Sequence, residues 1–265
     1  MWNLAPGSEL IIGGSAWRMG ALLTGAAVQF SSHATLIVFT SLAVVMILGT
    51  GVAAFSAETV SSRPGAARSL NPHVSVPRAA RREFVASIPV HAAAWMLAGL
   101  FMGLVPTILR DLLDLHSGLL NGATVFVEAA AASVAGLFLG RPTPRRTVFV
   151  GGAGVLLGTA VIKAGVASGT LSLLWVGGIV GGVGFGASFS GAVRTIAPLA
   201  QPHQRAGLFA AVYLVAYLSF GVPAIVAGLL IAPVGLLGTV LGYGVIILVT
   251  ATVGLLAQHR VATSR

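Results

Sequence analysis

The stretch Ala34–Ser56, ATLIVFTSLAVVMILGTGVAAFS, contains no charged residue and decides the fold class of this protein. It exceeds the about 20 apolar residues that an α-helix needs to cross the hydrocarbon core of a bilayer. Backbone groups inside hydrocarbon must find their hydrogen bonds within the same segment, so a run of this kind crosses the membrane as a helix. The stretch therefore predicts a membrane-spanning helix.

The rest of the chain has the same apolar character. Of its 265 residues, 56% are hydrophobic and 8% are charged, and the mean hydropathy is +0.96. A soluble domain has about 25% charged residues, so this composition excludes a water-soluble enzyme. At roughly 30 to 35 residues for each helix and connection, the length accommodates about seven or eight crossings.

Hydropathy predicts eight spanning segments in an all-α, polytopic membrane bundle. They are Leu10–Phe30, Ala34–Ser56, Phe84–Leu109, Leu119–Gly140, Thr147–Ala167, Leu171–Ala197, Ala206–Ile231 and Val234–Ala257. The one long connection, residues 57–83, has the Ser, Arg and Pro content that is typical of a solvated linker. It separates two helices in residues 1–56 from six helices in residues 84–258, and residues 259–265 form a tail.

Basic residues predict the orientation, because cytoplasmic loops carry an excess of Lys and Arg. On one side of the eight-span arrangement lie Arg63, Arg68, Arg78, Arg81, Arg82, Arg141, Arg145, Arg146, Arg194, Arg205, Arg260 and Arg265. The other side has only Arg110 and Lys163. Asp111 and Asp114 stand near Arg110. We therefore expect a multi-pass protein of the plasma membrane with both termini in the cytoplasm.

Several functional classes lack the residues that they need. The chain contains no cysteine, which excludes disulfide frameworks, thiol nucleophiles and iron–sulfur clusters. Its net charge of +9 could suggest a nucleic-acid partner. A basic patch of that kind needs a soluble face, however, whereas these arginines stand between apolar runs. We expect no cofactor, no metal site and no nucleic-acid partner.

Two charged residues fall deep inside the predicted spans, where an ionised group is costly. Glu128 lies about nine residues into its span, which at 1.5 Å per residue places it about 13 Å deep. It is either a site for proton coupling or for a cationic solute, or a neutral carboxyl that only packs. Arg18 either contacts an acidic partner, for which Glu128 is available, or snorkels to the cytoplasmic interface.

A histidine and a serine within the spans raise two further hypotheses. His91 could carry protons near neutral pH, or it could be a hydrogen-bonded structural residue. An intramembrane serine protease would need Ser188 within about 3 Å of a helix-borne histidine, and His91 is the candidate. Pro89 and Pro106 permit kinks in the span that carries His91, as Pro223 does elsewhere.

Small residues recur every fourth position in the span Leu171–Ala197. Gly178, Gly182, Gly186 and Ser190 form a smooth strip along one face of that helix, and such strips allow another backbone to approach closely. The glycines fit neither the GxGxxG nor the Walker pattern, and no strand precedes them. They therefore predict helix packing rather than nucleotide binding.

The two-plus-six arrangement with a basic linker resembles the major facilitator superfamily, whose members have two six-helix halves joined by a cytoplasmic linker. Residues 84–258 resemble the carboxy-terminal half. The family's fifth helix has its counterpart in Gly20–Phe30, and its sixth helix in Leu36–Phe55. The exit into the linker resembles Glu58-Thr59. Ala210–Leu230 resembles the eleventh helix of bacterial exporters in this family.

The family also has a loop motif after its second and eighth helices. The resemblance implies that the corresponding loop of this chain is a cytoplasmic gating loop. The motif's approximate counterparts here are Gly136, Arg141, Arg145 and Arg146. Gly140 stands where the motif has an aspartate. In the family the fifth and eighth helices face each other, so the resemblance brings Arg18 and Glu128 close together.

The resemblance implies a secondary active transporter and not an enzyme. It would export a small, drug-like solute by alternating access, with protons as the coupling ion and the lipid bilayer around it. The first four helices of the family have no counterpart, so we expect an incomplete chain or a reduced protein that assembles with a missing amino-terminal portion. A non-transporting membrane subunit or scaffold is the alternative, and the serine protease is a remote one.

Overall fold

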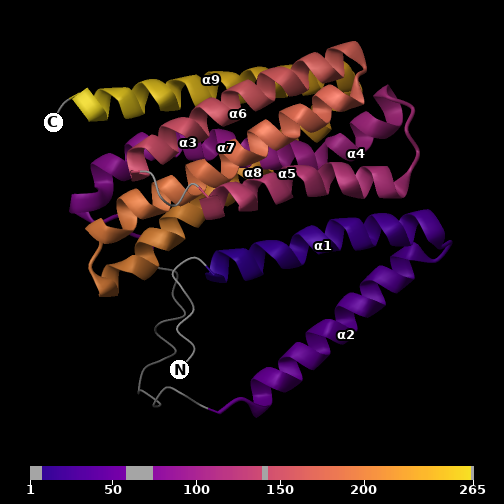
Figure 1. The fold of residues 1–265 in the computed structure, drawn as a ribbon, viewed down its shortest axis with the longest axis horizontal. Helices are drawn as coiled ribbons and strands as arrows, with labels where there is room; N and C mark the ends of the chain where they lie inside the picture. Colours follow the sequence, from indigo (N-terminus) through magenta and orange to yellow (C-terminus); the bar gives the residue numbers. More distant parts are fainter. Residues whose placement is uncertain (1–7, 58–73, 139–142, 264–265) are drawn as a thin grey trace.

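Figure 1 shows the computed structural model, which describes residues 8–57, 74–138 and 143–263. Within these ranges the chain is helical and contains no strand. The side chains of residues 8–18, 137 and 261–263 lie outside the description, as do most of the predicted linker and Arg141.

Eight long helices follow one another along the described part of the chain. They are α1 (Ser8–Phe30), α2 (Ala34–Phe55), α3 (Arg78–Gly103), α5 (Gly118–Phe138), α6 (Pro144–Ser168), α7 (Leu171–Ile196), α8 (Arg205–Val234) and α9 (Leu236–Thr263). Among the described residues, seven helices are long and apolar enough to cross a membrane, and Met19–Phe30 of α1 adds a shorter apolar segment. The prediction of an all-α bundle of membrane-length helices is confirmed.

Both ends of the third predicted span differ from the hydropathy prediction. α3 begins at Arg78 rather than Phe84, because hydropathy detects only the apolar part of a helix that continues outward through charged residues. At its other end α3 stops at Gly103, and the short helix α4 (Val105–Thr107) and the π-helix η2 (Ile108–Leu112) follow. Pro106 lacks the N–H that a continuous α-helix would bond at this point.

α3 is the central helix of the bundle. In its most apolar stretch 72% of the residues are buried. Its side chains Leu97 and Phe101 form the main core together with Ile162 of α6 and Ile247 of α9. By contrast, α2 buries none of its residues and lies apart from the other helices, beyond α1 (Figure 1).

Glycines bring the backbones of α6 and α7 into direct contact. A methyl group added to Gly154 would lie 2.8 Å from Cα of Gly184, and one added to Gly158 would lie 2.5 Å from Cα of Gly181. No side chain fits into such spaces. Because lipid is as apolar as the helices, close packing of this kind replaces the hydrophobic effect in holding the helices together.

The strip of small residues that the sequence singled out lies on two further sides of α7. A methyl group on Gly182 or Gly186 would overlap backbone carbonyls of α5, those of Glu128 and Ala132 respectively. A methyl group on Gly178 would lie 2.8 Å from the ring of Phe101 on α3. α7 therefore packs closely against α3, α5 and α6 at the same time.

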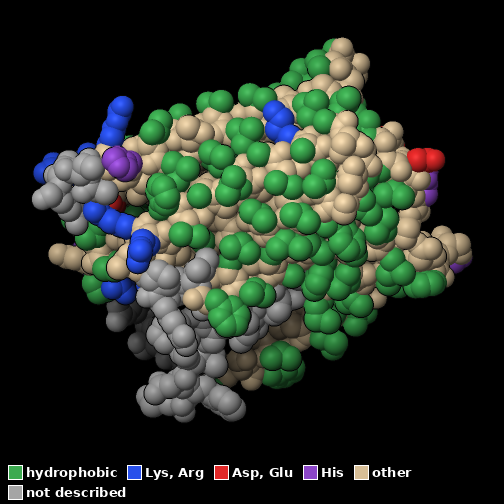
Figure 2. Space-filling view, turned by 45° about the horizontal axis from the view of Figure 1, so that its top comes forward, with side chains coloured by type: hydrophobic (Ala, Val, Ile, Leu, Met, Phe, Trp, Pro, Cys, Tyr) green, Lys and Arg blue, Asp and Glu red, His purple; other side chains and the backbone are tan. Residues whose placement is uncertain are grey.

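The up-and-down order of the helices places most basic residues at one end of the bundle. This basic end carries the described residues Arg78, Arg81, Arg82, Arg145, Arg146, Arg194, Arg205 and Arg260. On the face of the molecule that Figure 2 draws, most Lys and Arg side chains lie at this end, and acidic side chains lie at the other end. At that opposite end Arg110 donates a hydrogen bond to Asp111, Nε to Oδ1 at 2.6 Å, which lowers the pKa of the Asp111 carboxyl.

Replacement of Gly184 by alanine tests whether backbone contact holds α6 and α7 together. The new methyl group would lie 2.6 Å from the carbonyl carbon of Gly154, and overpacking of this kind costs about 1–3 kcal/mol. We expect Gly184→Ala to lower the midpoint of unfolding in mixed detergent micelles, followed by far-UV circular dichroism.

Gly228→Ala on α8 is the matched control, because a methyl group there meets nothing within 4 Å. Alanine is the better helix former by about 1 kcal/mol, so the control should be neutral or more stable. Equal effects of the two substitutions would contradict the packing argument.

Candidate functional site

A cluster of aromatic rings joins α3, α7 and α8. Its members are His91, Trp95, Phe185, Phe189, Tyr213, Tyr217 and Phe220. Trp95 lies at its centre, with its ring centroid 5.2 Å from that of Phe185 and 6.0 Å from that of Tyr217. We call these seven residues the aromatic cluster.

Helical spacing accounts for six of the seven residues of the aromatic cluster as three pairs, and Phe220 follows Tyr217 by three residues on α8. His91 and Trp95 stand four residues apart on α3, as do Phe185 and Phe189 on α7, and Tyr213 and Tyr217 on α8. Residues four apart lie on the same face of a helix. This spacing is the signal in the sequence from which the cluster could have been suspected, although it does not show that the three faces meet.

The aromatic cluster extends from the interior of the bundle to its surface. His91 is 4% exposed and stacks on Phe189, with ring centroids 5.7 Å apart. Tyr217 is 64% exposed and stacks on Tyr213 at 6.1 Å. Stacked and edge-on rings form an apolar wall whose faces attract flat or cationic groups.

The buried part of the cluster carries polar atoms without ordinary hydrogen bonds. The indole nitrogen Nε1 of Trp95 has no hydrogen-bond partner among the described residues. The ring of His91 approaches the backbone of Val212, yet neither of its nitrogens makes a hydrogen bond of ordinary geometry with a described residue. Buried polar groups are costly when left unpaired, so these atoms are candidates for binding a ligand or a proton.

Glu128 is a second buried polar group, on α5. It is 3% exposed, and its Oε1 has no hydrogen-bond partner in the part of the chain that the structure describes. Its neighbour Thr124 is already paired, because it accepts a hydrogen bond of 2.9 Å from Nε1 of Trp175. Asn121, on the same side of α5, also has a buried and unpaired Oδ1. The sequence argument singled out Glu128 but not Asn121, because it considered charged side chains inside the spans and Asn121 is uncharged.

α5 also packs against α1, the helix that carries Arg18. Gln29 of α1 accepts hydrogen bonds from Oγ of Ser117 at 3.1 Å and from the backbone of Gly118 at 2.9 Å. A methyl group on Gly25 would lie 2.6 Å from the carbonyl oxygen of Gly118. The side chain of Arg18 lies outside the described residues, so its contact with Glu128 stays a prediction.

The arginines of the predicted gating loop have different surroundings. Arg145, at the start of α6, forms an ion pair with Glu83 of α3, with Nη2 and Oε1 2.8 Å apart. The Glu83 side chain is 5% exposed. Arg146 is exposed, and Arg141 lies outside the described residues. The sequence did not indicate Glu83 as a candidate residue, because Glu83 lies at the end of the predicted linker.

The described residues give less support to a serine protease or a metal site. Ser188 lies against Gly151 of α6, and its Oγ has no hydrogen-bond partner there. The hydrogen bond to His91 that the protease hypothesis requires is therefore not formed. No group of three or more His, Asp or Glu side chains that could hold a metal ion occurs among the described residues.

A double-mutant cycle tests the ion pair at the basic end. We expect Glu83→Gln and Arg145→Gln each to destabilise the fold, and the combined variant to lose less than their sum. Because the Arg145 side chain is about a third exposed, water screens the pair, and we expect a coupling free energy of about 1–2 kcal/mol. The measurement is the unfolding midpoint in mixed micelles.

The control is a second double-mutant cycle, which combines Glu83→Gln with a substitution of Arg146 instead of Arg145. Arg146 makes no ion pair with a described residue, so Glu83→Gln and Arg146→Gln should add within about 0.5 kcal/mol. Coupling of the same size in both cycles would mean that the general charge of this end, rather than the ion pair, is responsible.

Comparison with known proteins does not assign the chain to a family. No family model, no curated protein and no solved structure matches it. The function is therefore argued below from the geometry of these helices and their buried polar groups.

Proposed function

We propose that this protein is a secondary active transporter, or the larger part of one, that moves an amphipathic aromatic solute across the membrane in exchange for protons. One observation carries the proposal. The interior of a bundle of membrane-length helices keeps polar atoms of Trp95 and Glu128 buried and without hydrogen-bond partners among the described residues, and the buried His91 makes no hydrogen bond of ordinary geometry with them. Such groups inside a membrane protein are typical of solute and proton pathways.

The aromatic cluster supports an aromatic or cationic solute. Trp and Tyr rings attract cations to their faces, at about 0.5–2 kcal/mol for each contact, and flat rings stack between them. The exposed rings of Tyr213 and Tyr217 give such a solute an entry, and Trp95 gives it a buried hydrogen-bond donor. The solute would then bind along the wall that α3, α7 and α8 form.

Glu128 supports proton coupling. A buried carboxylate is stable in apolar surroundings only with a cation beside it, whereas the neutral acid needs none. A proton and a cationic solute therefore compete for the same carboxyl group. In an exchanger of this kind, arrival of the solute cation releases the proton from Glu128, and arrival of the proton releases the solute.

Breaks in the helices support movement of the kind that alternating access requires. α3 ends at Gly103 and continues as a π-helix at Ile108–Leu112, and π-helical turns often occur at functional sites. Pro89 and Pro223 lie inside α3 and α8. The resemblance to the major facilitator superfamily agrees with this mechanism, with export as the direction and the basic end in the cytoplasm.

One observation favours the alternative of a non-transporting membrane subunit. α2 is an apolar helix of 22 residues, none of which is buried. A helix of this kind contacts only lipid or a partner, such as an amino-terminal portion or another membrane protein. A scaffold would bind its partner without moving a solute, so a flux measurement separates the two functions.

Flux in proteoliposomes tests the transport proposal, with ethidium as the amphipathic aromatic cation. We expect an imposed pH gradient to drive ethidium movement, and ethidium to cause proton movement, each followed by fluorescence. Glu128→Gln should reduce the coupled flux by about tenfold or more, because the amide cannot exchange a proton. Glu128→Asp should keep part of it.

Asp111→Asn is the control for the loss of one carboxylate, since Asp111 lies exposed at the far end of the bundle. It should leave the flux unchanged. Normal coupled flux in Glu128→Gln would overturn the coupling role of this residue. Absence of flux in the unmodified protein would favour the scaffold.

Removal of an exposed aromatic ring tests solute binding at the aromatic cluster separately from proton coupling at Glu128. We expect Tyr217→Ala to raise the KM for ethidium by about two- to tenfold, because an aromatic contact contributes about 0.5–1.5 kcal/mol. Phe149→Ala is the control, since Phe149 is 51% exposed on α6 and lies outside the aromatic cluster. An equal rise of KM in both variants would contradict binding at the cluster.

A further inference from the structure

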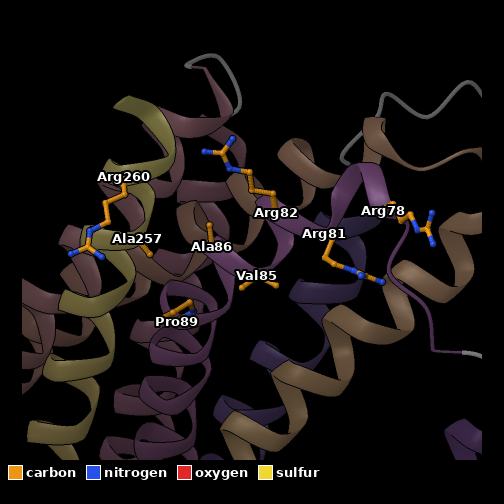
Figure 3. A pocket seen from close by; sticks show the side chains of 8 residues that line it. All are labelled: Arg78, Arg81, Arg82, Val85, Ala86, Pro89, Ala257 and Arg260. Atoms are coloured by element: carbon orange, nitrogen blue, oxygen red, sulfur yellow. The ribbon is translucent and has the colours of Figure 1, made fainter. Parts of the chain in front are cut away.

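A basic groove lies at the same end of the bundle as most arginines, where α3 and α9 meet. Its volume is about 760 Å³, and it is lined by Arg78, Arg81, Arg82, Val85, Ala86, Pro89, Ala257 and Arg260. Figure 3 shows that the arginines come from both helices, with Arg260 on α9 and the others on α3. We call this feature the basic groove. Its volume is within the range of ligand pockets, about 300–1,000 Å³.

The basic groove changes from charged to apolar along the axis of α3. Arg78 and Arg81 begin it, and Val85 and Pro89 continue it toward the middle of the bundle. Pro89 follows Arg78 by eleven positions, which at a rise of 1.5 Å per residue is about 16 Å. Val85 is 57% exposed, so the apolar part of the groove is open on the outside of the bundle. A ligand that fills the groove therefore needs an anionic head and an apolar body.

No acidic residue lines the basic groove to neutralise its arginines. Glu83 is close in sequence, but it is buried and bonded to Arg145. Arg82 and Arg260 take part in further interactions. Arg78 and Arg81 are exposed and form no ion pair with any residue that the structure describes.

We infer that the basic groove binds an anionic phospholipid from the leaflet that surrounds the basic end. The guanidinium groups of Arg78 and Arg81 bind its phosphate, a geometry in which arginine donates two parallel hydrogen bonds. The acyl chains lie along Val85, Ala86 and Pro89. Basic pockets between transmembrane helices bind lipid head groups in this way. The apolar floor selects a lipid over a water-soluble phosphate, because only a lipid covers it.

The test measures lipid selectivity of the full chain in phosphatidylcholine bilayers by electron spin resonance. Spin-labelled phosphatidylglycerol is compared with spin-labelled phosphatidylcholine. We expect the protein to prefer phosphatidylglycerol. Arg81→Gln should reduce this preference by about fivefold, which corresponds to about 1 kcal/mol for one basic residue at a membrane surface.

Two further variants locate the binding site. Arg146→Gln removes an exposed arginine from the same end but outside the groove, and it should leave the preference unchanged. Val85→Asn keeps every arginine and makes the floor polar, so it should weaken retention of the lipid. Far-UV circular dichroism and gel filtration verify that each variant is folded.

The remaining outcomes overturn the inference. Equal losses in Arg81→Gln and Arg146→Gln would mean a general effect of surface charge. Equal retention of both lipids by the unmodified protein would mean that the groove does not select anions. Displacement of labelled phosphatidylglycerol by glycerol phosphate, with no effect of Val85→Asn, would assign the groove to a soluble anion. The measurement needs no solute flux, so its result is independent of the proposed transport.

Discussion

Close contact between helix backbones at α7 positions three other helices of the bundle. In a bilayer the helices gain little by leaving lipid for one another, so their association relies on packing. Glycines on α7 meet α6 at Gly158 and α5 at the carbonyl of Glu128, and a third side receives Phe101 of α3. Because three neighbours approach one helix this closely, the positions of α3, α5 and α6 depend on each other.

The same helix links the two parts of the candidate site. Phe185 and Phe189 place α7 in the aromatic cluster beside Trp95. Gly182, three residues before Phe185 and therefore on the same side of α7, lies against the backbone of Glu128. A small displacement of α7 would change both the aromatic wall and the surroundings of the carboxyl group. In the proton-coupled transport that we propose, α7 would therefore be the element that connects the solute site with the proton site.

Arginines at the basic end have roles that residue type alone does not reveal. Arg145 is paired with a buried carboxylate and fastens α6 to α3. Arg78 and Arg81 are exposed in the basic groove, where an anion can reach them. All three contribute equally to the charge asymmetry that predicts orientation. Only their neighbours in space distinguish a structural ion pair from a candidate site for lipid phosphate.

Three features could be predicted from the amino-acid sequence alone, because each depends on residues near one another in the chain: the membrane-length helices, the arginines at one end and the glycine faces of α7. The sequence also singled out Glu128 by depth. The ion pair of Glu83 with Arg145, 62 positions away, and the meeting of aromatic pairs from three helices are visible only in the folded bundle. Hydropathy and helical spacing describe one helix at a time, whereas these contacts depend on how each helix is rotated and packed against its neighbours.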